Sequence, residues 1–133
     1  MPTPAQRSVA VRNAQGDAFE ATIGTDAKLE IRTGAKPANC AAAATGTQLV
    51  LMNLPTDWLA NAAAGVKAKA GTWSGTAIAA GTAGYYRILD NAGTTCHEQG
   101  LIGTGEPMEI DNAVIAIGQT VTVTAYQFTV GNA

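Results

Sequence analysis

The sequence predicts an all-β domain of about eight short antiparallel strands, arranged as a sandwich or a barrel. Apolar and polar residues alternate in several segments, most regularly in residues 120–130, and this period of two is typical of strands with one buried face. Glycine-containing turns divide these segments at intervals of roughly ten residues. Neither an alternation of strands with helices nor an internal repeat is visible.

Size and composition indicate a single domain with a thin core. The chain has 133 residues, enough for one domain. Hydrophobic residues make up 47% of it, but many are alanine and only 5% are aromatic, as suits a two-layer sandwich. Charged residues make up 14%, below the typical value of about 25%. Small neutral side chains must therefore cover the surface, which suits a protein packed into an assembly better than a freely diffusing enzyme.

Charge and hydropathy exclude two classes of partner. The net charge is −2 and no run of Lys and Arg exists, which argues against nucleic-acid binding. No apolar stretch approaches the roughly 20 residues that span a membrane. The first residues lack the long apolar region of a signal peptide, so we expect the chain to be made and kept in a reducing cytoplasm.

Residues 1–24 are predicted to form an extended N-terminal arm, and residues 25–133 the β domain. Residues 1–16 are rich in Pro, Gln, Asn and Arg, and only residues 8–11 could form a short strand. Residues 18–23 alternate weakly. We expect the arm to become ordered mainly through contact with another molecule.

Two strands are predicted in the first half of the β domain. Residues 28–33 alternate cleanly, which places Leu29 and Ile31 on the buried face. Residues 47–54 form the most apolar run and are predicted to be a central strand. The Ala-rich residues 38–46 between them are predicted to be a linker, because so short a run does not hold a helix unaided.

Residues 56–64 allow two interpretations. Trp58, Leu59 and Ala62 have helical spacing, and Thr56 could cap a helical turn. Gly65 and the shortness of the segment favour instead a loop followed by a strand over residues 66–70. The sequence leaves both open.

The second half is predicted to contain a hairpin followed by short strands. Residues 85–90 and 95–100 form its two strands, and Gly93 in the connecting loop can adopt a positive φ. Residues 71–76 are interpreted as a turn. Further short apolar segments lie at 77–80, 108–110 and 114–117, the last two on either side of a turn at 111–112.

The final strand, residues 120–130, changes phase midway. Val121 and Val123 share one parity, whereas Tyr126, Phe128 and Val130 share the other. A slip of one residue moves the buried set to the opposite face. We therefore expect a bulge near Ala125, or a strand that is buried on both faces.

The two cysteines, Cys40 and Cys96, are predicted to be small, half-buried thiols, because the expected compartment is reducing. The alternative is a disulfide between them, which would close the long loop from residue 40 to residue 96. A metal site would need more ligands, since only His97 lies nearby. The sequence therefore predicts no metal and no cofactor.

No catalytic site is predicted. His97 is the only histidine, and its neighbour Glu98 should point to the opposite face of the sheet. No nucleophile elbow surrounds either serine of the triads that could be considered, which would combine Ser8 or Ser74 with Asp90 or Asp111. The carboxylates lack calcium-loop spacing, and the glycines at 71, 75, 81 and 84 form no phosphate-binding loop.

Aromatic residues are expected in the core or at a subunit interface. The set consists mainly of Trp58, Trp73, Tyr85 and Tyr86. A carbohydrate-binding face would need two or three coplanar exposed rings, and the adjacent Tyr85 and Tyr86 should face opposite ways. Arg87 shares a face with Tyr85, and we expect it to pair with a nearby carboxylate.

The stretch from Leu29 to Val130 resembles the capsid decoration, or cement, proteins of tailed phages and prophages. The first matching motif is Leu29-Glu30-Ile31-Arg32-Thr33-Gly34-Ala35-Lys36-Pro37-Ala38, which precedes the Ala-rich linker. The others, in order, lie at residues 45–50, 79–90, 93–95 and 117–124. Tyr86 before Arg87 fits the aromatic that members of this family usually carry before the arginine.

This resemblance implies a β-sandwich of jelly-roll type that binds the outside of the major capsid shell as a small homo-oligomer, a dimer or a trimer. It implies a location on the virion surface and carries no catalytic residues. The arm, residues 1–24, would add strands to a neighbour's sheet edge. Two alternatives remain: a minor tail, fibre or head–tail component of the virion, and a carbohydrate-binding β-sandwich module.

Overall fold

The computed structural model describes residues 6–129, which form one helix and ten strands. The prediction of a mostly β, antiparallel fold is confirmed. The elements are α1 (Val9–Ile23), β1 (Lys28–Arg32), β2 (Gln48–Asn53), β3 (Val66–Ala68), β4 (Ser74–Thr76), β5 (Gly81–Thr82), β6 (Tyr85–Leu89), β7 (Cys96–Leu101), β8 (Met108–Ile110), β9 (Val114–Ile115) and β10 (Thr120–Thr129).

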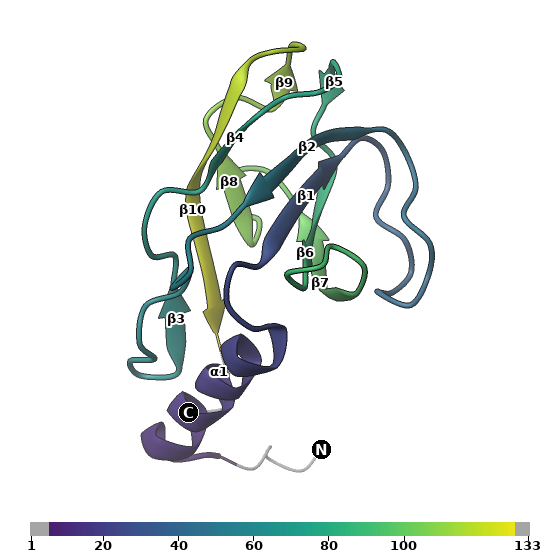
Figure 1. Cartoon of the computed structure of the whole chain (residues 1–133). Coiled ribbons are helices and arrows are strands. Elements are labelled where there is room, and N and C mark those ends of the chain that lie inside the picture. Colours follow the sequence, from purple (N-terminus) through teal and green to yellow (C-terminus); the bar gives the residue numbers. More distant parts are fainter. Residues whose placement is uncertain (1–5, 130–133) are drawn as a thin grey trace.

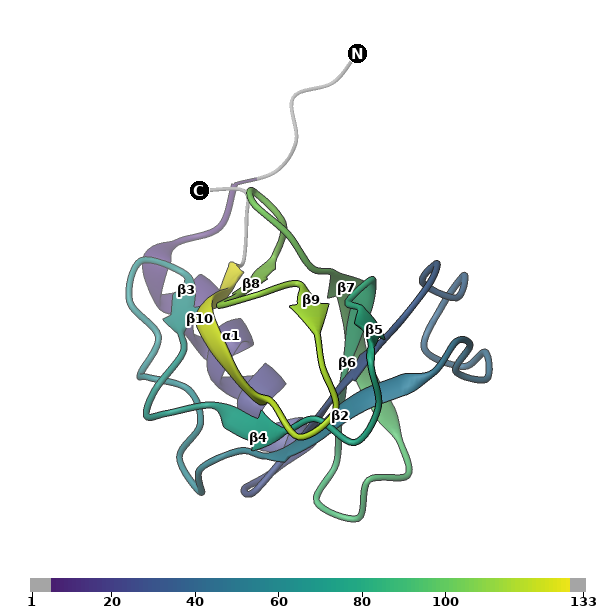
Figure 2. The same cartoon turned by 90° about the horizontal axis from the view of Figure 1, so that it is seen from above.

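The strands form two sheets of four strands and one small pair. The first sheet has the order β2-β1-β6-β7, and in the second β10 pairs with β3, β4 and β8. The edges of the two sheets approach each other, because Ile78 N donates to Leu49 O at 2.8 Å and Ile102 bridges to Met108. Seen from above, the strands therefore surround a common interior, and β5 and β9 lie at the upper end of the molecule (Figures 1 and 2).

The number of strands differs from the expected eight. Residues 74–76, interpreted as part of a turn, form β4 because they pair with residues 120–122 of β10. Residues 81–82 form β5 by pairing with β9. β4 has three residues and β5 has two. Segments this short show no alternation of their own, so they are identified as strands only by the partner with which they pair.

The prediction of an extended N-terminal arm is wrong for residues 9–23. Residues 9–23 are helical, and the short strand expected at 8–11 does not exist. The side-chain oxygen of Ser8 accepts a hydrogen bond from Val11 N at 3.2 Å and caps the helix. Gly24 ends the helix at a φ of 92°. Residues 1–5 of the predicted arm lie outside the described residues.

Helix α1 is held against β3 and the turn before it by the buried side chains of Lys67 and Arg12 (Figure 1). The side chain of Lys67 is 2% exposed, and its Nζ lies 2.8 Å from both Asp17 Oδ1 and Glu20 Oε1. Arg12 donates to Ala64 O at 2.9 Å. Gly16 lies directly over Lys67, where a Cβ would come within 3.2 Å of the lysine stem. The helix is therefore an integral part of the domain.

The buried positions predicted for β1 and the phase change predicted for β10 are confirmed. Leu29 and Ile31 are fully buried, as predicted. The pairing of β10 with β8 shifts register between Val123 and Ala125, so the predicted bulge exists at this position. Val121, Val123 and Tyr126 are all buried on account of that shift. Val130 lies outside the described residues.

Three further predictions can be compared with the structure. Residues 56–64 contain no helix and lead into β3, so the interpretation as a loop followed by a strand is correct. Gly93 has a φ of 73° in the hairpin loop, as expected. The prediction that the strand at 47–54 is central is wrong, because β2 is at the end of its sheet, with β4 of the second sheet beside it.

Aromatic rings form a continuous row through the core. Phe19 of α1 stacks on Phe128 of β10 with ring centroids 4.0 Å apart. The row continues from Phe19 through Trp58, Trp73 and Tyr126 to Tyr86, with neighbouring centroids 5.2–6.2 Å apart. Their burial joins the helix to both sheets, which confirms the assignment of these aromatic residues to the core.

Candidate interaction surface

The residues considered for catalysis do not assemble. Ser8 caps α1 and Ser74 lies in β4, and within residues 6–129 no hydrogen bond connects either serine to His97. Asp90 accepts bonds from Thr94 and Thr95 in the hairpin loop, and Asp111 accepts from Asn112 and Thr122. The described residues contain no group of three or more potential metal ligands.

Glu98 instead forms a polar link between three strands. Its Oε1 accepts hydrogen bonds from Tyr86 Oη of β6 and from Tyr126 Oη of β10, both at 2.7 Å. Burial raises the pKa of Glu98, and the two hydroxyl donors counteract this only in part. Burial, together with the nearby carboxylate, also raises the pKa of both tyrosines. The cluster joins the two sheets and leaves no free donor for a substrate.

The raised pKa of Glu98 predicts a pH dependence of stability. The folded chain holds this proton more tightly than the unfolded chain, so the free energy of unfolding should fall as pH rises from 4.5 through the raised pKa. Glu98→Gln should remove this fall, as measured by urea denaturation between pH 4.5 and 7. The pKa values of Asp17 and Asp90 are lowered from 3.8, so these two groups change the free energy of unfolding below pH 3.8, outside the measured range. An unchanged slope in the variant would contradict the assignment to Glu98.

The aromatic residues do not form an exposed platform. Trp58, Trp73, Tyr85 and Tyr86 are at most 1% exposed. The indole nitrogens donate to backbone carbonyls, Trp58 to Gly24 and Trp73 to Ala70. A sugar could not stack on these four rings without unfolding of the core.

Arg87 has partners other than the expected carboxylate. Its Nε donates to Gln99 Oε1 at 3.1 Å, because Arg87 and Gln99 face each other in the β6–β7 ladder. Its NH2 group donates to Ala42 O at 2.8 Å and to Asn39 O at 3.4 Å. The Ala-rich residues 38–46 therefore fold over this guanidinium group.

The prediction of two free thiols is wrong, because Cys40 and Cys96 form a disulfide. Cys96 begins β7, and Cys40 lies in the loop that folds over Arg87. The two cysteines are 56 residues apart in the sequence, and no local sequence pattern indicates that they pair.

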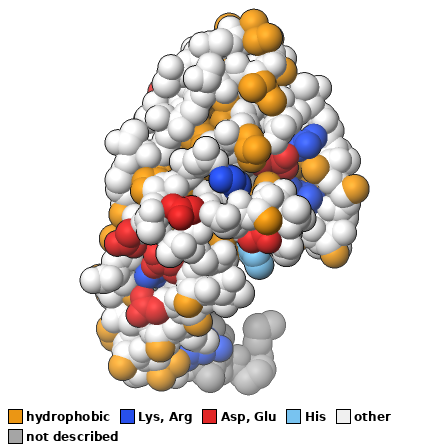
Figure 3. All heavy atoms as spheres, in the orientation of Figure 1, with side chains coloured by type: hydrophobic (Ala, Val, Ile, Leu, Met, Phe, Trp, Pro, Cys, Tyr) orange, Lys and Arg blue, Asp and Glu red, His pale blue; other side chains and the backbone are white. Residues whose placement is uncertain are grey.

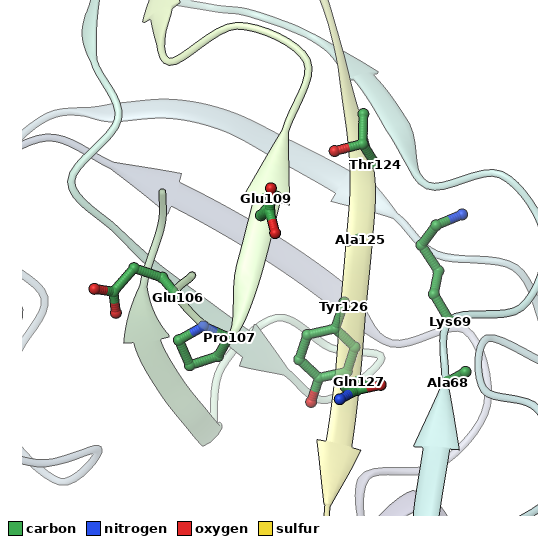
Figure 4. A pocket seen from close by; sticks show the side chains of 9 residues that line it. All are labelled: Ala68, Lys69, Glu106, Pro107, Glu109, Thr124, Ala125, Tyr126 and Gln127. Atoms are coloured by element: carbon green, nitrogen blue, oxygen red, sulfur yellow. The ribbon is translucent and has the colours of Figure 1, made fainter. Parts of the chain in front are cut away.

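A shallow groove of about 350 Å³ runs along β10 (Figure 4). Lys69 lies on one side of this strand and Glu106 and Glu109 lie on the other, with Tyr126 between them. Lys69 Nζ already donates to Gly71 O at 2.8 Å. The charged groups do not converge on one point, so the groove lacks the polar focus of a ligand site.

The most distinctive surface is the apolar end, which we define as Ile78, Val114 and Ile117. These side chains are 59%, 66% and 70% exposed. Val114 lies in β9, and Ile78 and Ile117 lie in the segments that precede β5 and follow β9, at the top of the molecule (Figure 1). Hydrophobic side chains are visible at this end in Figure 3. Ala77 N donates to Gln119 O and Gly118 N donates to Ala77 O, both at 2.8 Å, which holds these segments together.

The apolar end is also built from uncharged sequence. Residues 70–86 and 112–129 contain no Asp, Glu, Lys or Arg. The charged side chains in Figure 3 accordingly lie below this end, over the middle and lower parts of the molecule. Exposed apolar side chains gathered on one part of a surface mark a contact site more often than a free surface.

Comparison with protein-family models, with curated proteins and with solved structures finds no match to this chain. Within the described residues, no helix is long and apolar enough to cross a membrane.

Proposed function

We propose that this protein is a non-enzymatic virion structural protein that binds the outer surface of a phage major capsid shell and stabilises it. The apolar end carries this proposal, because Ile78, Val114 and Ile117 expose aliphatic surface on segments without charges. Binding there covers apolar area at about 25 cal/mol per Å² and desolvates no charged group. This is the chemistry of a protein–protein contact.

The choice of partner rests on the resemblance of residues 29–130 to capsid decoration proteins. On the same ground we propose that the strands follow a jelly-roll arrangement and that the protein acts as a dimer or a trimer. A protein that binds only the closed shell stabilises that shell by mass action. Each bound copy thus opposes the opening of the shell under internal pressure.

The disulfide supports a location on the outside of the virion. Disulfides persist in oxidising surroundings, among them virion surfaces, and are rare in the cytosol. A chain made in the host cytoplasm would carry Cys40 and Cys96 as thiols and would be oxidised later.

The two alternatives differ in their support. A carbohydrate-binding module requires exposed coplanar rings, whereas Trp58, Trp73 and Tyr85 are buried. A minor tail, fibre or head–tail component could use the same apolar end. Quantitative gel analysis of particles distinguishes it, since a decoration protein is present in high copy number and a tail component in low copy number.

Ile117→Asp is expected to weaken binding to undecorated capsid shells by at least about tenfold, because the new carboxylate would be desolvated at the contact. Co-sedimentation of purified protein with the shells measures this affinity. Leu51→Asp is the matched control, since Leu51 is 44% exposed on β2 outside the apolar end. It should bind like the wild type.

The possible outcomes distinguish an error in the proposed contact surface from an error in the proposed function. Equal binding by Ile117→Asp and the wild type would exclude the apolar end as the contact. A wild-type protein that fails to sediment with shells would contradict the function itself. Thermal unfolding of both variants establishes that neither loss comes from misfolding.

A further inference from the structure

Residues 38–46 form a loop that is tied down by polar contacts on both sides of Cys40. Gln99 Nε2 donates to Pro37 O at 2.7 Å, just before the loop. Arg87 donates to Asn39 O and Ala42 O within it. Tyr85 Oη accepts from Thr45 N at 2.9 Å and donates to Thr45 O at 2.6 Å at its end. The loop contains no charged residue of its own.

The loop covers two buried charged side chains. Arg87 is 5% exposed and Glu30 is 7% exposed. A partly open pocket of about 350 Å³ is lined by both of these residues, by Cys40 and its neighbours in the loop, and by Cys96. The Ala-rich loop is thus the cover of Arg87 and Glu30, and the disulfide joins this cover to β7.

We infer that the Cys40–Cys96 disulfide is a redox-dependent clasp, which closes the loop at residues 38–46 over Arg87 and Glu30 after the domain has folded. In the reduced protein the β ladders remain and the loop opens more often. Oxidation locks the cover in place. This inference does not depend on the proposed function.

Closing the clasp requires an oxidant, for which a low-molecular-weight disulfide such as oxidised glutathione suffices. One protein thiolate attacks this disulfide and releases one small thiol, which leaves a mixed disulfide on the protein. The second protein thiolate then displaces the other small thiol. One S–S bond breaks and one forms, and two protons and two electrons pass from the protein to the small thiols. Both cysteines are only half-buried, so a small disulfide can reach them.

The fold provides for closure without depending on it. The β6–β7 ladder is made by backbone pairing, in which neither sulfur takes part. The contacts from Gln99, Arg87 and Tyr85 hold the loop in position, with the two cysteine Cα atoms 5.2 Å apart. Bond formation is therefore a final local step.

Hydrogen exchange followed by mass spectrometry tests the clasp on the full chain, with and without dithiothreitol. The amides of Ala42 and Thr45 are hydrogen-bonded in the closed loop, and we expect them to exchange at least about tenfold faster after reduction. The amides of β10 exchange through global unfolding and serve as the internal reference: they should stay protected after reduction, with faster exchange only to the extent that the whole domain is less stable. The Cys40→Ser/Cys96→Ser variant should exchange like the reduced protein in both conditions.

Two results would overturn the inference. Equal loop exchange in the oxidised and reduced proteins would show that the disulfide does not hold the cover. Complete loss of β10 protection on reduction would show that the disulfide is needed for the whole fold, so that it is not a clasp on a folded domain. Faster exchange in the loop, with β10 still protected, supports the inference.

Discussion

Replacing both cysteines with serine is expected to lower the free energy of unfolding by about 4 kcal/mol. The disulfide closes a loop of 56 residues in the unfolded chain, and the loss of loop-closure entropy at that length gives this magnitude. Urea denaturation of the oxidised wild type and of Cys40→Ser/Cys96→Ser measures the difference.

Reduced wild-type protein is the natural control for this variant. It should unfold at the same urea concentration as the double serine variant, because both lack the crosslink and keep the other contacts of the loop. A variant within about 1 kcal/mol of the oxidised wild type would contradict a stabilising role for the disulfide.

Trp58→Ala is expected to lower the free energy of unfolding by a similar amount, about 4 kcal/mol. Trp58 is fully buried and lies between Phe19 of α1 and Trp73 in the aromatic row. Its removal leaves a large cavity where the helix meets the sheets, and it also removes the hydrogen bond to Gly24 O. Chemical denaturation followed by circular dichroism measures the loss.

Trp58→Phe separates the two contributions. Phenylalanine keeps most of the ring contact and loses only the Nε1 donor and part of the volume, so its cost should be about 1–2 kcal/mol. Equal destabilisation by the two variants would mean that the hydrogen bond, and not the filling of the core, dominates at this position.

The sequence predicts the local features of the sheets well. A period of two and β-branched residues identify the strands, and the change of parity between Val123 and Tyr126 identifies the bulge in β10. These signals are local, because the buried positions of β1 and the phase change of β10 are written in the sequences of those two strands. The pairing of the very short β4 and β5 depends on remote partners and is not visible in the same way.

The sequence does not indicate helix α1, because the buried face of this helix is not apolar throughout. Arg12, Gly16, Phe19 and Ile23 have helical spacing, but a charged residue and a glycine occupy half of this face. Their burial depends on Lys67 and Ala64, which lie about fifty residues away along the chain. The capping serine at residue 8 was the available local signal.

The sequence indicates only part of the apolar end. The uncharged stretches 70–86 and 112–129 can be read directly. The sequence does not show which of their apolar residues are buried. Ile115 lies in the core, whereas the nearby Val114 and Ile117 are exposed. The disulfide and the hydrogen bonds of Arg87 to the backbone also join segments that are far apart in the sequence, so they cannot be predicted from a local pattern.

Site-specific photocrosslinking on assembled particles tests the central claim most directly. A photoreactive amino acid at position 117, in the apolar end, should crosslink to the major capsid protein. The same group at Ala18, exposed on α1 at the opposite end of the molecule (Figure 1), should not. Crosslinks to the shell from position 18 and none from position 117 would contradict the account.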